Sequence, residues 1–356
     1  MERSAAWEKP KGESRHFQAR IWQISRNQVF CSRWHQWASC RTPGPVECRL
    51  LYEDRIEEVM FASLMVPLDR SPFSEQALPF AVKIAERAHA SLEFVAIHRS
   101  YVFGDHHASN AWALKLDSGQ EAEIVQQEEE YLAEQARRVM AESKVLATTA
   151  VLSGSVVDSQ SIAERILEQA QLKNADLIVM TTHGRRQMSR LGLGSVADEL
   201  VRRSHLPVLL VSPGDEDHPK VFEPKLDHFL IPLDGSKLSE RILVPALELA
   251  QLTNARGTLL RVVSARCSDE ERKGAEEYLE QVAASARQQG IDVQTKVISS
   301  SHPVDTILQE AESRECNLIT VATHGYGGFK RMLLGSVADK IVRHAPMPVL
   351  VHCPNQ

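Results

Sequence analysis

From Ala62 onward, short apolar runs alternate with longer amphipathic segments. The short runs have the length and the polar boundaries of strands buried on both faces of a parallel sheet, and the longer segments have helical periodicity. The predicted strands are 64–69, 91–97, 145–152, 176–181 and 207–211. The predicted helices are 72–88, 121–142, 157–172 and 194–203, and residues 99–120 are predicted to form a long loop.

The pattern then starts again. Residues 229–236 read Phe-Leu-Ile-Pro-Leu-Asp-Gly-Ser and repeat the first predicted strand, with Asp234 lying 165 positions after Asp69. The distance between matching residues of the two copies falls from 165 to 147 and then to 141 later in the chain. The first copy therefore carries two insertions that the second copy lacks. The intervening segment holds three prolines and several charges. We therefore predict a first domain at 60–213, a linker at 214–225 and a second domain at 226–356.

Strands alternating with helices predict an α/β fold, here two tandem Rossmann-like domains. Each domain is expected to be a five-stranded parallel sheet with helices on both faces and right-handed crossovers. Ligands of such sheets bind beyond the carboxyl ends of the strands, where the winding reverses. The terminal strands 207–211 and 348–351 are apolar edges, so we expect an intramolecular pseudo-dimer or a homodimer through them.

One motif follows the fourth predicted strand of both copies. It reads Thr-His-Gly, then a loop of nine residues, then Gly-Ser-Val-Ala-Asp, and its two occurrences are 141 positions apart. The Gly-Ser begins a predicted helix, whose first N–H groups lack partners and whose dipole attracts negative charge. The sequence therefore predicts a phosphate site at each of these helix starts.

Composition narrows the class of function. The chain has 356 residues and a net charge of −6, which argues against a general nucleic-acid or membrane partner. No apolar run reaches the length of a membrane span, and no secretory signal is recognisable. The six cysteines show no repeated spacing, so we expect a cytoplasmic protein. His106 and His107 have no further ligands at a suitable spacing, and we assign no metal site.

Residues 1–59 differ from the rest. The first fifty hold four of the five tryptophans and a net charge of +5, without strand or helix periodicity. We expect an unstructured N-terminal extension, with Met60 as a natural start. A nucleic-acid-binding arm and a zinc site at Cys31, His35, Cys40 and Cys48 are the alternatives, but the spacing lacks paired cysteines.

The order of these motifs resembles the universal stress protein (UspA) family, over about residues 62–353 in two tandem copies. The resemblance implies the adenine nucleotide alpha hydrolase-like version of the fold and a site for ATP or AMP, with Mg²⁺ accompanying ATP. It implies that the aspartates hold the ribose, that backbone groups near Ile97 and Val262 meet the adenine, and that the loop and helix start hold the phosphates. The implied nucleotide-binding residues are Asp69, Ile97, Thr181, Gly184, Gly194, Ser195 and Val196 in the first copy, and Asp234, Val262, Ala322, Gly325, Gly335, Ser336 and Val337 in the second.

The chain departs from the family motif at one glycine in each copy. Thr181 and Ala322 stand where nucleotide-binding members carry the first glycine, and a side chain there narrows the approach of a phosphate. Because alanine is smaller than threonine, and because the second copy also keeps an Asp-Gly-Ser opening, we expect it to be the better nucleotide site. The basic residues of the loops (Arg185, Arg186, Arg190, Lys330 and Arg331) either neutralise phosphate or are simply solvated.

Several interpretations of these residues stay open. Asp69 and Asp234 are ribose ligands or merely caps of the following helix. His183 and His324 lack a catalytic partner, so a structural bond to the loop backbone is favoured. The favoured function is a nucleotide-binding stress regulator. The alternatives are a dimerisation module without nucleotide, and a slow ATPase or self-phosphorylating protein using Ser195 or Ser336.

Overall fold

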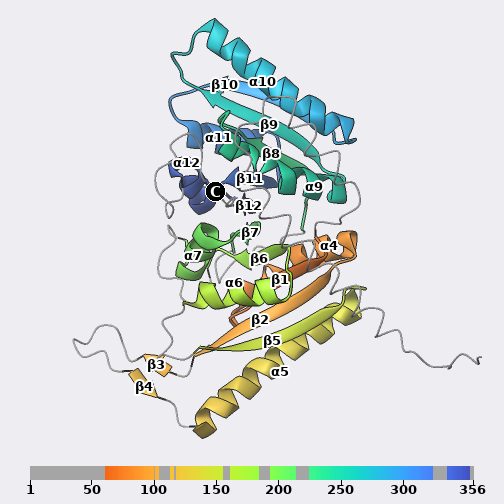
Figure 1. Cartoon of the computed structure of the whole chain (residues 1–356), viewed down its shortest axis with the longest axis vertical. Coiled ribbons are helices and arrows are strands. Elements are labelled where there is room, and N and C mark those ends of the chain that lie inside the picture. The colour runs from red at the N-terminus through yellow and green to blue at the C-terminus, as the bar shows by residue number, and fades with distance from the viewer. Residues whose placement is uncertain are drawn as a thin grey trace, which may run out of the picture. The chain divides into compact units, whose positions relative to one another are not determined.

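The computed structural model describes residues 61–99, 101–103, 113–115, 118–154, 161–183, 193–213, 224–323 and 335–352. The predicted N-terminal extension and most of the predicted linker lie outside these residues. Both predicted domains are present in the described part as α/β units (Figure 1).

The first unit contains β1 (Ser63–Pro67), α3 (Pro72–Glu75), α4 (Leu78–Ala88), β2 (Ser91–Arg99), β3 (Tyr101–Phe103), β4 (Ala113–Lys115), α5 (Ser118–Glu142), β5 (Ala147–Gly154), α6 (Ile162–Leu172), β6 (Leu177–Thr181), α7 (Ser195–Arg203) and β7 (Val208–Val211). The second contains β8 (His228–Pro232), α8 (Lys237–Glu240), α9 (Leu243–Thr253), β9 (Arg256–Val263), α10 (Asp269–Gln288), β10 (Val293–Ser299), α11 (Pro303–Ser313), β11 (Leu318–Ala322), α12 (Ser336–His344) and β12 (Val349–His352).

The strands of each unit form a parallel sheet in the same order. It runs β5-β2-β1-β6-β7 in the first unit and β10-β9-β8-β11-β12 in the second. The opening strand of each unit therefore lies beside the fourth strand, where the winding reverses. The last strands β7 and β12 pair antiparallel, with Leu350 opposite Leu209, so the two sheets continue into one sheet of ten strands.

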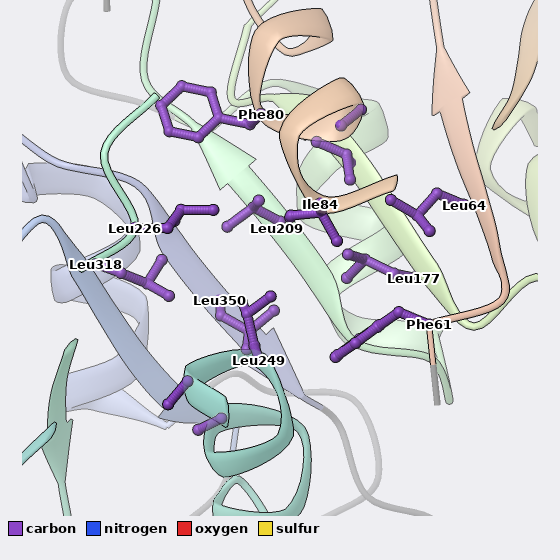
Figure 2. Packing of buried hydrophobic residues seen from close by; sticks show 14 of the residues in the cluster. Phe61, Leu64, Phe80, Ile84, Leu177, Leu209, Leu226, Leu249, Leu318 and Leu350 are labelled. Carbon is purple, nitrogen blue, oxygen red and sulfur yellow. The ribbon is translucent and has the colours of Figure 1, made fainter. Parts of the chain in front are cut away.

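Two apolar layers cover the sheet. Helices α4, α5, α9 and α10 contribute to one layer, and α6, α7, α11 and α12 to the other. Figure 2 shows part of the first layer, where Ile84 of α4, Leu209 of β7 and Leu350 of β12 come together although they belong to different units. All three side chains are fully buried. The core therefore continues across the β7–β12 seam.

Three sequence predictions need correction. The helix predicted at 72–88 is broken into α3 and α4, because the chain turns at residues 76–77 and Ala77 starts a new helix. The predicted loop 99–120 contains the paired strands β3 and β4 as well as the first residues of α5. Helix α6 begins only at Ile162, because Ser161 and Glu164 form a capping box that fixes its start.

Candidate functional site

The chain makes the same hydrogen-bonded turn after the opening strand of each unit. In the first unit, Asp69 Oδ1 accepts hydrogen bonds from Ser71 N (3.1 Å) and Ser71 Oγ (2.5 Å). Ser71 Oγ in turn accepts from Ser74 N (3.1 Å), so Ser71 is the N-cap of α3. The aspartate therefore does not cap the helix itself. It holds the serine that does.

The second unit repeats this turn. Asp234 Oδ1 accepts from Ser236 N (2.9 Å), and Ser236 Oγ accepts from Ser239 N (3.1 Å) as the N-cap of α8. Asp234 is exposed, whereas Asp69 is half-buried. In both units one carboxylate oxygen fixes the turn, and the carboxylate is thereby held at the carboxyl edge of the sheet.

The helices that follow the fourth strands begin at this same edge. Gly194 N donates to Thr182 O (2.8 Å) and Gly335 N donates to Thr323 O (2.6 Å), so each chain segment returns to the end of β6 or β11 before its helix starts. A Cβ on Gly194 would lie 2.9 Å from Thr182 O, which explains the glycine. No side chain caps α7 or α12. The first N–H groups of these helices, at Ser195 and Val196 and at Ser336 and Val337, are therefore suited to an anion.

The predicted adenine contacts lie level with the aspartates. Pro67 is paired with Val95 and Pro232 with Leu260 in the strand register, so Ile97 and Val262 stand two residues further along, as the aspartates do. Ile97 and Val262 are half-buried and pack against the second apolar layer. Each unit therefore arranges an aspartate, a strand end and an uncapped helix start along one edge of its sheet.

The two residues that replace the first motif glycine have different surroundings. Thr181 is buried at the end of β6, and its Oγ1 donates to the carbonyl oxygen of His183 (2.8 Å). Ala322 is half-buried at the end of β11 and packs against the first apolar layer. The hydroxyl of Thr181 is thus already used by the loop backbone.

Comparison with known proteins gives this arrangement a family. The model of the universal stress protein family matches residues 60–212 and 225–352, which is most of the chain. The chain belongs to the universal stress protein family. Universal stress protein Rv1996 of Mycobacterium tuberculosis is 26% identical over 313 residues, covering 81% of this chain and 94% of that protein. Universal stress protein Rv2005c of the same organism is 29% identical over 235 residues, covering 61% of this chain and 77% of that protein.

A solved structure supports the fold. The universal stress protein from Archaeoglobus fulgidus aligns with a TM-score of 0.63 at 21% identity, covering 82% of this chain and 98% of that one. The likeness extends over both units, so the chain is a tandem universal stress protein with adenine nucleotide alpha hydrolase-like domains.

Some predicted residues of this universal stress protein fall outside the described part of the chain. These are the motif glycines Gly184 and Gly325, the histidine His324 and the basic loop residues Arg185, Arg186, Arg190, Lys330 and Arg331. Their roles stay predictions.

His183 lies just inside the described residues, at the end of β6. Its Nδ1 is 3.0 Å from Thr182 Oγ1. The predicted bond between the imidazole and the loop backbone involves residues 184–192, which lie outside the described part of the chain, so it stays a prediction. Burial lowers the pKa of His183, and the charge of Arg343 lowers it further. The lowered pKa favours the neutral imidazole, and among the described residues its Nε2 has no hydrogen-bond partner.

Sequence reasoning missed a second pair of matched contacts beside the aspartates. Tyr131 Oη donates to Glu75 Oε1 (2.9 Å) in the first unit, and Tyr278 Oη donates to Glu240 Oε1 (3.0 Å) in the second. Burial and then the adjacent glutamate raise the pKa of both tyrosines above the ordinary range, so both stay protonated donors. The sequence did contain a signal for these contacts: the tyrosines are 147 positions apart and the glutamates 165, which are the distances between matching residues of the two copies.

The described residues were also searched for a metal-binding cluster and for a membrane-spanning helix. No cluster of three or more His, Cys, Asp or Glu side chains there is arranged to hold a metal ion. Within the same residues, no helix is both long and apolar enough to cross a membrane.

Proposed function

We propose that this universal stress protein binds an adenine nucleotide, ATP or AMP, at the carboxyl edge of its sheets and acts as a stress-response regulator. One observation carries the proposal: in both units the opening strand, which an aspartate follows two residues later, lies beside the strand that leads to an uncapped helix start. A carboxylate suits the two hydroxyls of a ribose, and a helix start suits phosphate, so the two groups match the two polar parts of a nucleotide.

In the second unit, Asp234 would hold the ribose and backbone groups at Val262 would meet the adenine. Gly335, Ser336 and Val337 would hold the phosphates, with Mg²⁺ accompanying ATP. The first unit offers Asp69, Ile97, Gly194, Ser195 and Val196 for the same roles. These assignments are supported by the family resemblance and by the common edge on which the residues lie.

We expect the second unit to bind more tightly. Its aspartate is exposed, and Ala322 adds only a methyl group where Thr181 adds a branched side chain. A nucleotide bound at this edge would change the surface that a partner protein meets there.

Calorimetric titration of the full chain with ATP and with AMP tests the proposal. Asp234→Ala should weaken the tighter binding about ten- to a hundredfold, the usual value of a hydrogen bond to a charged group, and Asp69→Ala should affect only a weaker component. Asp292→Ala is the control, because Asp292 is equally exposed but lies just before β10, at the amino edge of the sheet.

Two outcomes would count against nucleotide binding. One is wild-type protein that takes up neither nucleotide, which would favour a dimerisation module built on the β7–β12 pairing. The other is an Asp234→Ala variant that binds as well as the Asp292→Ala control.

A further inference from the structure

An arginine stands beside the proposed ribose site in the second unit. Arg261 lies on β9, immediately before Val262, and its guanidinium is 5.1 Å from the ring centre of Tyr278. It also lies against Gly235, the residue after Asp234. A Cβ placed on Gly235 would be 2.6 Å from Arg261 Nη1 and 2.8 Å from Nη2. The cation therefore rests on the turn that presents the Asp234 carboxylate.

The donors of this guanidinium have no acceptor among the residues that the structure describes. No hydrogen bond or ion pair joins Arg261 to a carboxylate or carbonyl in the described part of the chain, although the side chain is half-buried. The nearby Glu240 accepts instead from Tyr278. A guanidinium carries five donors in a planar fork that fits phosphate oxygens, so this one is suited to an anionic ligand.

The first unit lacks this feature. The position of Arg261 is occupied there by Ala96, and the position of Gly235 by Arg70, as the offset of 165 shows. Arg70 is exposed and has a φ of 65°, close to the 80° of Gly235, so the two turns have the same backbone. The Cβ of a residue at this place would occupy the space that the guanidinium takes in the second unit. Gly235 and Arg261 thus form a matched pair.

We propose that Arg261 makes the second unit selective for adenine nucleotides that carry a phosphate on the ribose 2′- or 3′-hydroxyl. The inference rests on the proposed function, in which Asp234 binds the ribose. A phosphate on one hydroxyl would meet the guanidinium, while Asp234 accepts the hydroxyl that remains. In dinucleotide-binding folds an arginine beside the ribose accommodates a 2′-phosphate in this way. Without such an arginine, the first unit should repel the same group through Asp69.

The test compares AMP, adenosine 2′,5′-bisphosphate and adenosine 3′,5′-bisphosphate in calorimetric titrations of the full chain at low ionic strength. One of the two bisphosphates should bind at least about tenfold more tightly than AMP, and its identity reveals which hydroxyl faces Arg261. Arg261→Gln should abolish this preference and leave AMP binding within about twofold of wild type. Arg70→Gln, which removes the exposed arginine next to Asp69 in the first unit, should leave the preference intact.

A second variant checks the matched pair. Gly235→Ala places a methyl group where the guanidinium lies, so the preference should fall while AMP still binds, and a thermal unfolding curve confirms that the variant is folded. A wild type that binds AMP and both bisphosphates equally would overturn the inference alone. Equal loss of all three ligands in Arg261→Gln would also overturn it, since that is the result of a merely structural arginine. Failure of all three nucleotides to bind would overturn it together with the proposed function.

Discussion

The two units share one backbone plan but differ at several buried or half-buried positions. Glu93 of β2 is replaced by Thr258 in β9, and Val211 at the end of β7 is replaced by His352 at the end of β12. The turn after the opening strand, by contrast, keeps in both units the bond from the serine N–H to the aspartate and the N-cap bond of that serine. The apolar strands and the Asp-x-Ser turn are therefore enough to specify the unit, and the remaining interior positions are free to diverge.

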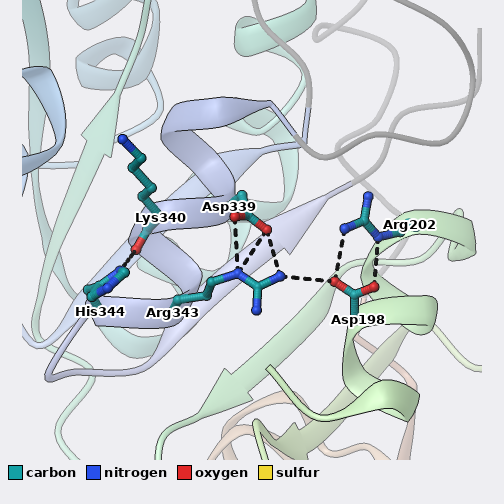
Figure 3. Close-up of polar contacts among 6 residues, drawn as sticks. All are labelled: Asp198, Arg202, Asp339, Lys340, Arg343 and His344. Carbon is teal, nitrogen blue, oxygen red and sulfur yellow. Dashed lines mark hydrogen bonds and ion pairs between the residues drawn. The ribbon is translucent and has the colours of Figure 1, made fainter. Parts of the chain in front are cut away.

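The two helices beside the seam carry matching ion pairs. Asp198 and Arg202 of α7 form an ion pair (2.8 Å), and Asp339 and Arg343 of α12 form the matching pair (3.0 Å). Arg343 also reaches Asp198 across the seam at 3.4 Å, as Figure 3 shows. Hydrogen bonding to Asp339 raises the pKa of Arg343. Because these side chains are partly exposed, the network orients the two helices more than it stabilises them.

The largest effect is expected from the core of the seam. Leu209 and Leu350 face each other in the β7–β12 register and are both fully buried. Leu209→Ala and Leu350→Ala should each lower the free energy of unfolding by about 2–5 kcal/mol, because each opens a cavity that the surrounding sheet cannot fill. The double variant should lose less than the sum, since both changes open the same space. Urea denaturation of the full chain measures all three.

Leu172→Ala is the control for this experiment, because Leu172 is 75% exposed and its loss should cost less than about 0.5 kcal/mol. Two separate unfolding transitions in the wild type, or a cost below about 1 kcal/mol at either seam leucine, would contradict a core shared between the units.

The sequence was sufficient for the fold because the fold follows from apolar periodicity. The parallel sheet of each unit was predictable from strand–helix alternation, whereas the neighbouring of β1 with β6 and of β8 with β11 comes from the structure. The break between α3 and α4 has a signal in the sequence that the prediction of one helix over 72–88 overlooked. Pro79 has no N–H to donate and stands in the first turn of α4.

The residues of the candidate site, too, were predictable only in part. Asp69, Asp234 and the two Gly-Ser helix starts repeat along the chain, so they could be found as a motif. Arg261 could not, because it has no counterpart in the first unit and gains meaning only through its contact with Gly235. A search for repeated motifs finds the residues that both copies share and overlooks those that distinguish one copy from the other.

The second-largest effect on stability is expected at Glu93, whose position in the second unit is occupied by Thr258. Glu93 is 3% exposed and is held by Gln169 Nε2 (2.9 Å) and by Lys173 Nζ (3.0 Å). Thr258, at the same place in the second unit, is bonded instead to His228 Nε2 (2.9 Å). Lys173→Met should therefore leave a buried carboxylate without its cation and cost about 1–3 kcal/mol, a value reduced because Lys173 itself is half-exposed.

Chemical denaturation near neutral pH measures the cost of Lys173→Met. Lys273→Met serves as its control, since the Lys273–Glu277 pair is exposed on both sides and should contribute little. Equal stability of the two variants would show that Glu93 does not depend on its cation.

The smallest effect is a pH dependence expected from His352, which has no counterpart histidine in the first unit. Burial, followed by the charges of Arg241 and His205, lowers the pKa of His352 to about 4 from its ordinary 6.5. The unfolded chain therefore binds a proton below pH 6.5 that the folded chain refuses, so this contribution to stability is complete above that pH and is lost as the pH falls toward 4. At pH 5 the loss should be about 1–2 kcal/mol relative to pH 7.5.

The pH dependence is best tested by giving the second unit the residue that the first unit has at the matching position, Val211. His352→Val copies Val211, and both positions have the same backbone role, since the carbonyl oxygen of Val211 accepts from Thr182 N (2.9 Å) and that of His352 from Thr323 N (3.1 Å). The substitution should therefore preserve the strand and flatten the pH dependence of the unfolding free energy between pH 7.5 and 5 by about 1–2 kcal/mol. If the profile of His352→Val matches that of the wild type over this range, the acid sensitivity comes from other groups, such as His183 and His228, whose pKa values are also lowered by burial.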